Sequence, residues 1–342
     1  MPYTTINKST EHFNTVTYSN AGDGAKAVTG VGFQPDLVWL KNRTVAYHPQ
    51  IHDAVRGASN GSLYTSTTNA VDSGYPISSF DSDGFTTGSQ SSNESQNSAS
   101  QVAWNWKAGT TSGISGGTIT PSAYSINTTS GFGIYQYTGT GSAGTIAHGL
   151  GKVPTMIIIK PTSTTGNWYC YHVKTGNDYT ILLNSTGAAY SSVNWQSTTP
   201  TNSVFSIRAG GDVNTSGVTY LAYVFCDVNG YSKFGSYIGN ANNDGVFVNT
   251  GFKPAFVMTK MSSGVQTWNI LDNKRNGYNP TERNLQASMN NAEDTGRDID
   301  LLSNGFKIRN GGTEMNGSGS TYIYMAFGQS LVGSNNVPCT AR

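Results

Sequence analysis

Residues Gly251–Lys260 read Gly-Phe-Lys-Pro-Ala-Phe-Val-Met-Thr-Lys, and two earlier places in the chain carry a variant of this run. Each variant has a proline, a variable residue, a short apolar run and a lysine six residues after the proline. The earlier variants are Pro35–Lys41 and Pro154–Lys160. Repetition at a long period has to be recognised before any local prediction, because it governs the architecture. The pattern predicts that the chain consists of three copies of one module.

The repeat extends well beyond these anchor runs. A tyrosine lies seventeen residues before each proline, and polar residues recur eighteen and twenty-one residues after it. A Leu-x-x-Ser-x-x-x-Ala frame follows, and an aromatic strand closes each copy. In chain order the members are Tyr18, Tyr137 and Tyr237, then Asp53, His172 and Asp272, then Arg56, Thr175 and Arg275, and finally the strands 102–106, 220–225 and 322–327. Each copy is long enough to bury a core of its own.

The strand pattern predicts an all-β fold of three tandem antiparallel β-sandwich repeats, similar to jelly rolls. Short apolar and aromatic runs bounded by Gly, Asn and Asp recur along the chain, and no long stretch has a helical period. The run 156–159 is apolar at every position, which indicates a strand covered on both faces. One short helix is expected at 281–292, with Thr281 as its N-cap. The predicted boundaries are 1–109 for copy one with an N-terminal arm, 110–130 for a Gly/Ser/Thr linker, 131–229 for copy two, 230–333 for copy three and 334–342 for a C-terminal tail.

Composition argues against two classes of partner. Charged residues make up 11% of the chain and the net charge is +1, so no basic surface for nucleic acid or for a membrane is expected. The N-terminus lacks the apolar stretch of a Sec signal peptide, and no apolar run is long enough to span a bilayer. We therefore expect synthesis in a cytoplasm, and a surface built from Ser, Thr, Asn, Gln and Gly.

The three cysteines, Cys170, Cys226 and Cys339, do not form a Cys-x-x-Cys pair, so zinc-site spacing is absent. Cys170 and Cys226 fall on strands of copy two, where they are expected as buried free thiols. A bond between the two is the alternative.

Catalytic patterns are weak. Two Gly-x-Ser-x-Gly strings, at 57–61 and 113–117, lack the strand-turn-helix setting of a nucleophile elbow. Asp81 with Asp83 and Asp298 with Asp300 are paired carboxylates, a requirement of glycosidases, but a turn and a solvated strand account for them. Asp53 with Arg56, and Asp272 with Arg275, predict ion pairs that stabilise a loop. The sequence therefore predicts no catalytic residue, no metal site and no cofactor.

Aromatic residues outside the repeated positions are the candidates for a ligand surface. Flat rings can stack on sugar rings while Asn and Ser side chains form hydrogen bonds with the hydroxyl groups. Five residues of this kind are predicted to contribute to a glycan or receptor surface: Tyr47, His48, Tyr190, Trp195 and Tyr278.

Three strings resemble a repeat of unknown function in virion proteins of marine bacteriophages, including cyanophages. They are 131–139 with 148–154, then 230–237, and then 249–254; the closing run 102–109 is similar as well. The resemblance covers nearly the whole chain and supplies no catalytic residues. It implies a virion structural protein of the tail or fibre class.

The function expected from these observations is that of a phage tail fibre, tip or adhesin that attaches to a host surface glycan. The expected partners are other virion proteins and further copies of the chain, with a homotrimer favoured. A capsid decoration or head-spike protein is the first alternative, and a polysaccharide depolymerase is the second.

Overall fold

The computed structural model describes residues 4–19, 24–74, 77–88 and 99–332. Almost all regular structure in these residues is antiparallel β-sheet, as predicted. The helical segments are η1 (Ser9–Glu11), η2 (Gly211–Val213) and α1 (Thr313–Asn316). No described helix has the length and apolar character needed to cross a membrane.

The three copies form main sheets of the same topology. In copy one the strand order is β1-β8-β3-β4-β5, so the closing strand β8 lies beside the anchor strand β3. Copy two has the order β14-β13-β12-β17-β10 within a larger sheet that adds β15 and β9, and copy three has β18-β25-β20-β21-β22. The strands of copy one are β1 (Phe13–Ser19), β3 (Leu37–Asn42), β4 (Gln50–Asp53), β5 (Leu63–Tyr64) and β8 (Ser100–Trp106). Those of copy two are β9 (Ala123–Asn127), β10 (Phe132–Thr138), β12 (Pro154–Pro161), β13 (Tyr169–His172), β14 (Tyr179–Leu182), β15 (Tyr190–Ser191) and β17 (Thr219–Cys226). Those of copy three are β18 (Ser232–Ile238), β20 (Pro254–Met261), β21 (Asn269–Asp272), β22 (Leu285–Gln286) and β25 (Thr321–Gly328).

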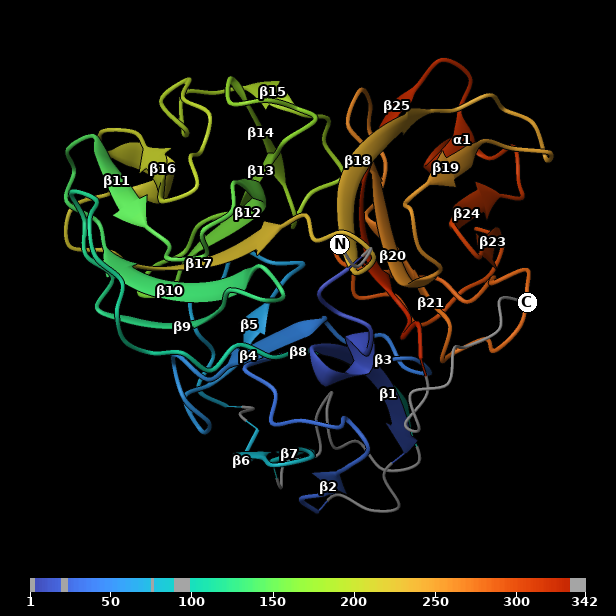
Figure 1. The fold of residues 1–342 in the computed structure, drawn as a ribbon, viewed down its shortest axis with the longest axis horizontal. Helices are drawn as coiled ribbons and strands as arrows, with labels where there is room; N and C mark the ends of the chain where they lie inside the picture. Colours follow the sequence, from blue (N-terminus) through green and yellow to red (C-terminus); the bar gives the residue numbers. More distant parts are fainter. Residues whose placement is uncertain (1–3, 20–23, 75–76, 89–98, 333–342) are drawn as a thin grey trace.

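The inner faces of the three main sheets meet in one central core. Figure 1 shows the copies around a common centre, with copy one in blue, copy two in green and copy three in orange. Trp106, Phe225 and Phe327 lie at or next to the ends of the three closing strands, and their ring centroids are 5.6–6.2 Å apart. The prediction of a separate core for each copy is therefore incomplete, because the largest core cluster draws its residues from all three copies.

The outer face of each main sheet is covered by a small second sheet. These small sheets contain β2 (Ala27–Val28), β7 (Gly84–Thr86) and β6 (Ser79–Asp81) in copy one, β11 (Gly144–Ala147) and β16 (Val204–Ile207) in copy two, and β19 (Phe247–Asn249), β24 (Gly305–Ile308) and β23 (Ile299–Leu302) in copy three. Each encloses a local apolar cluster. In β12, Met156 and Ile158 face the central core while Ile157 and Ile159 face the outer cluster. The prediction that this run is covered on both faces is confirmed.

Repeated polar positions join one copy to the next around the ring. The anchor lysines Lys41, Lys160 and Lys260 each donate a hydrogen bond to a backbone carbonyl of another copy, at Asn290, Thr68 and Thr186 (3.0–3.2 Å). The residues eighteen positions after the prolines contact the other neighbour, because each lysine bonds to the preceding copy in the cycle and each of these residues bonds to the following one. Asp53 accepts from Tyr223 (3.0 Å), His172 contacts the Tyr324 carbonyl (3.2 Å), and Asp272 accepts from Trp104 (3.0 Å).

Two expectations about connecting segments are wrong, those for the linker and for the helix. The predicted linker 110–130 contains β9, which pairs with β10 along five residues, so it belongs to the sheet of copy two. The predicted N-terminal arm packs into the central core through Ile6, which is 2% exposed. The expected helix at 281–292 contains β22 instead, because Leu285 pairs with Ile270 as its counterparts do in the other copies. The predicted tail 334–342 lies outside the described residues.

Cys170 and Cys226 are buried free thiols, as predicted. They lie in different apolar clusters, one in the central core and one in the outer cluster of copy two. Cys339 lies outside the described residues.

Candidate functional site

A pocket of about 380 Å³ opens on the outside of copy three. Its walls come from the residue before the anchor proline, the turn after β21, strand β23 and the segment after β25. The lining residues are Lys253, Asn273, Gly277, Tyr278, Asn279, Thr281, Leu301 and Gln329. Tyr278 is 76% exposed at this pocket, the highest exposure of any large apolar or aromatic residue in the described part of the chain. The pocket therefore combines one open aromatic ring with amide and hydroxyl groups and with the ammonium group of Lys253.

An ion pair within copy three stabilises the turn that carries Tyr278. Arg275 Nε lies 2.6 Å from Asp272 Oδ2, and both side chains are fully buried. The amides of Lys274 and Arg275 donate to the other carboxylate oxygen at 3.0 Å. Burial favours the neutral acid, but the charge and hydrogen bonds of Arg275 and the Trp104 indole outweigh it, so the pKa of Asp272 lies below its usual value. The predicted ion pair is present, and it fixes the backbone at the pocket.

The rim beyond the turn is held by side-chain amides. Asn279 both donates to and accepts from the backbone of Leu301 in β23, at 3.2 and 3.0 Å. Asn276 donates to the Pro280 carbonyl at 3.1 Å. These bonds attach the Tyr278 loop to the small outer sheet, so the pocket is formed before any ligand arrives.

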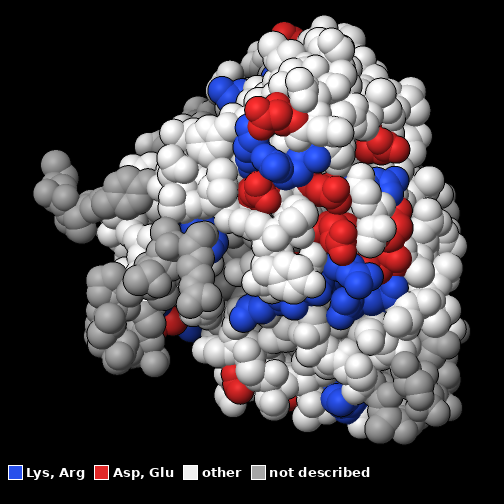
Figure 2. Space-filling model, turned by 90° about the vertical axis from the view of Figure 1, so that its right-hand side faces the viewer, with Lys and Arg blue, Asp and Glu red and all other residues white. Residues whose placement is uncertain are grey.

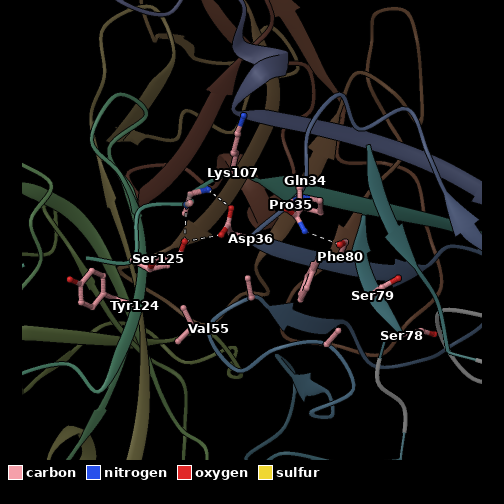
Figure 3. Close-up of a pocket in the computed structure, with 15 residues that line it drawn as sticks. Gln34, Pro35, Asp36, Val55, Ser78, Ser79, Phe80, Lys107, Tyr124 and Ser125 are labelled. Atoms are coloured by element: carbon pink, nitrogen blue, oxygen red, sulfur yellow. Dashed lines mark hydrogen bonds between the residues drawn. The ribbon is translucent and has the colours of Figure 1, made fainter. Parts of the chain in front are cut away.

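Copy one has a pocket at the equivalent place, and it is larger. Gln34 lines the copy-one pocket and Lys253 lines the copy-three pocket, and each directly precedes its anchor proline. In the same way Ala54 and Asn273 line the two pockets, and each lies nineteen residues after its anchor proline. Its volume is about 540 Å³, and residues from β9 of copy two add a further wall (Figure 3).

The matching positions of copy two differ in chemistry. Val153 and Val173 stand there, 46% and 36% exposed. The side chains at these two surface positions therefore differ among the three copies, whereas the core strands are the same.

The family of proteins described as "Domain of unknown function (DUF7483)" matches residues 8–330. The chain belongs to the DUF7483 family. The match starts in copy one and ends in copy three, so the family unit spans the whole ring. No curated protein and no solved structure matches the chain.

Five aromatic residues of this DUF7483 protein were predicted to form a ligand surface, and for Trp195 that prediction is wrong. Its side chain is 1% exposed, it packs on Tyr171, and its indole N–H donates to the Tyr179 carbonyl at 3.1 Å. A position outside the repeat can still be buried, because copy two has its own outer cluster, and Trp195 belongs to it.

The other four residues do not gather into one site. Tyr278 lies in copy three. Tyr190 lies on β15 of copy two and is 39% exposed. Burial and the nearby Asp212 carboxylate raise the pKa of Tyr190 to about 12. Tyr47 and His48 are half-buried in copy one, where the Tyr47 carbonyl accepts from Lys41 and His48 Nδ1 lies 2.8 Å from Ser66 Oγ.

The paired carboxylates have structural partners. Asp81 accepts from the hydroxyls of Ser79 and Thr86, both at 2.7 Å. Asp83 accepts from the backbone amides of Gly30 and Gly32, which lower its pKa. These contacts agree with the predicted turn.

Charged groups also lie on and beside strand β23, which contributes Leu301 to the copy-three pocket. Asp300 lies 3.4 Å from Arg309. Burial, and then the charge of Glu282, raise the pKa of Asp298. Figure 2 shows acidic and basic groups interleaved on the copy-three side of the molecule. Within the described residues, no three His, Cys, Asp or Glu side chains are grouped so as to hold a metal ion.

Tyr278 was predicted from the sequence, but the pocket around it was not. Lys253, Asn273 and Gln329 are far apart in sequence, and only their repeat positions connect them to Gln34, Ala54 and Ala108 of copy one. A comparison of the polarity of equivalent residues in the three copies could have indicated these positions.

Proposed function

We propose that this protein is a bacteriophage virion protein of the tail that attaches to a host surface glycan through the copy-three pocket. The observation that supports the proposal most is the exposed Tyr278 ring at a preformed pocket with amide and hydroxyl walls. Aromatic faces stack on the apolar faces of sugars, and amides bind hydroxyl groups with little conformational cost when they are already held. The ligand class is therefore a neutral or weakly charged saccharide.

The virion part of the proposal is supported by the resemblance to repeats of marine phage virion proteins. The low charge of the surface also suits it, because contacts between uncharged groups depend little on salt. Other virion proteins and further copies of this chain, with a trimer favoured, are the proposed partners. A capsid decoration protein is the alternative. Immuno-gold labelling of intact particles separates the two, since label over the head would contradict a tail location.

The glycan site can be tested with two variants of one residue. A panel of host surface polysaccharides is screened first, and the affinity of the best binder is measured by calorimetry. We expect Tyr278→Ala to weaken binding about fivefold or more, because a stacked ring contributes on the order of 1 kcal/mol or more. Tyr278→Phe retains the ring and should bind within about threefold of the wild type.

Tyr179→Ala is the matched control, because Tyr179 is 45% exposed in copy two, far from the pocket in sequence. Equal losses in Tyr278→Ala and Tyr179→Ala would show that the pocket is not the site. Absence of binding to every polysaccharide tested would refute the glycan function itself.

A further inference from the structure

The copy-one pocket differs from its copy-three equivalent by a carboxylate. Asp36 stands directly after the anchor proline, where copy three has Ala255 and copy two has Thr155. Asp36 Oδ1 accepts from Ser125 Oγ at 2.8 Å and Oδ2 accepts from the Ala108 amide at 2.7 Å. Ser125 belongs to β9, so the carboxylate lies where copies one and two meet.

Within the part of the chain that the structure describes, this carboxylate lacks a basic partner in an ion pair. Among the described residues, none of the ion pairs involves Asp36. Lys107 lines the same pocket, but Figure 3 shows its side chain directed away from Asp36. Burial raises the pKa of Asp36, and Lys107 lowers it only as the weakest of the contributions. Burying an anion without a cation beside it costs free energy, so Asp36 lacks the positive charge that would stabilise its carboxylate.

The rest of the pocket wall is mixed, because polar residues such as Gln34, Ser78 and Ser79 line it alongside apolar ones. Pro35, Val55 and Phe80 contribute walls around the carboxylate, together with Ala54, Ala58 and Ala108. Figure 3 shows Val55 and Phe80 below the Asp36 and Ser125 pair in this view, Val55 on the Ser125 side and Phe80 on the Gln34 side. A ligand that fits must therefore carry a positive group at one end and an apolar body behind it.

We infer that the copy-one pocket binds a primary ammonium group on an apolar stem, with Asp36 as its counter-ion. Each carboxylate oxygen already accepts one hydrogen bond, so single bonds from a compact ammonium suit the remaining lone pairs better than the paired bonds of a guanidinium. The walls suit methylene groups, as in the side chain of lysine. This site is independent of the proposed glycan pocket.

Two probes test the site and identify the source of the ammonium. Affinity is measured by calorimetry for 1,5-diaminopentane and for Nα-acetyl-lysine methylamide, with 1-pentanol as the uncharged comparison. We expect both amines to bind and pentanol to bind at least tenfold more weakly. Tighter binding of the diamine indicates a free amine as the ligand, and tighter binding of the lysine derivative indicates a polypeptide partner.

Asp36→Asn is the decisive variant, because an amide can still accept from Ala108 and donate to Ser125 Oγ. We expect it to weaken amine binding at least tenfold. Asp178→Asn removes an exposed carboxylate of copy two and should leave binding unchanged. V55K, which adds a basic stem to the pocket wall, should also abolish binding while Asp36 remains, so the test does not depend on one variant folding. Equal affinity of wild type and Asp36→Asn, or equal affinity for pentanol, would overturn the inference.

Discussion

Gly239 illustrates how a single repeated residue supports the module. It lies two residues after Tyr237, as Gly139 lies two after Tyr137. A Cβ at Gly239 would stand 2.3 Å from the Gly317 carbonyl oxygen, and one at Gly139 would stand 2.2 Å from that of Thr215. The glycine lets a loop approach so closely that the tyrosine hydroxyl can reach it, at Met315 O (2.8 Å) in copy three. The tyrosine and glycine recur together in copies two and three, where they form one packing unit.

Gly239→Ala should therefore destabilise the protein. We expect a loss of about 1–3 kcal/mol in the free energy of unfolding, because the added methyl group forces the backbone apart. Gly277→Ala is the control, since a Cβ there has no atom within 4 Å. Urea denaturation monitored by tryptophan fluorescence measures both. If both variants were as stable as the wild type, the close approach would have no energetic role.

At the scale of elements, the anchor strands carry the contacts that join the copies. Lys41, Lys160 and Lys260 are each at most 1% exposed, and their hydrogen bonds go to backbone carbonyls. Burial without a carboxylate partner lowers the pKa of Lys41 to about 7 and those of Lys160 and Lys260 to about 8. A lysine that ends each anchor run thus works as a hydrogen-bond donor between sheets.

These lysines predict a stability that rises between pH 7 and 9. In this range the unfolded lysines, with a pKa near 10.5, bind more protons than the folded ones, so raising the pH favours folding. Each lysine contributes up to about 1.4 kcal/mol per pH unit where its two states differ by a full proton. The window ends near pH 9 because burial raises the pKa of Cys170 and of tyrosines such as Tyr231, which reverses the slope at higher pH.

Urea denaturation at a series of pH values checks this dependence. The triple variant Lys41→Met, Lys160→Met and Lys260→Met should lose most of the slope, whatever its absolute stability. A slope as steep in the variant as in the wild type would assign the pH dependence to other groups.

At the scale of the whole molecule, three sheets enclose one core and close into a ring. Copies one and three, which are distant in sequence, are joined by Arg43 and Glu293 at 2.8 Å and by the Trp104 bond to Asp272. The N-terminal segment adds Ile6 and Phe13 to the same centre, where Phe13 stacks on Phe327. A copy that lost its neighbours would expose the inner face of its main sheet, which is a large apolar surface.

We therefore expect the full chain to unfold in one transition. Calorimetric and van't Hoff enthalpies should agree, as for a single cooperative unit. Phe327→Ala should destabilise that unit by about 3–5 kcal/mol, because it opens a cavity where the copies meet. Three separate transitions, with only the last copy affected by Phe327→Ala, would instead indicate independent domains.

The sequence by itself determined the strands, one ion pair and the three-fold repeat. The apolar runs and turn residues predicted strands because a residue's preference for extended structure depends on near neighbours. The Asp272–Arg275 ion pair could be expected because three residues of separation bring the two groups together in a turn. The repeat of Pro, tyrosine and lysine likewise predicted three equivalent modules, and their main sheets have the same topology.

Only the tertiary structure decided the features that depend on packing between distant parts of the chain. Strand β22 forms where a helix was expected, since pairing with β21 outweighs the helix preference of a short segment. Trp195 is buried and Tyr278 is exposed, although both are aromatic residues outside the repeat, because burial depends on which surfaces the neighbouring sheets cover. The shared core and the two pockets arise from residues that lie far apart in the chain. The repeat spacing shows which positions are equivalent but not which of them touch, because contacts between copies depend on how the three sheets pack against one another.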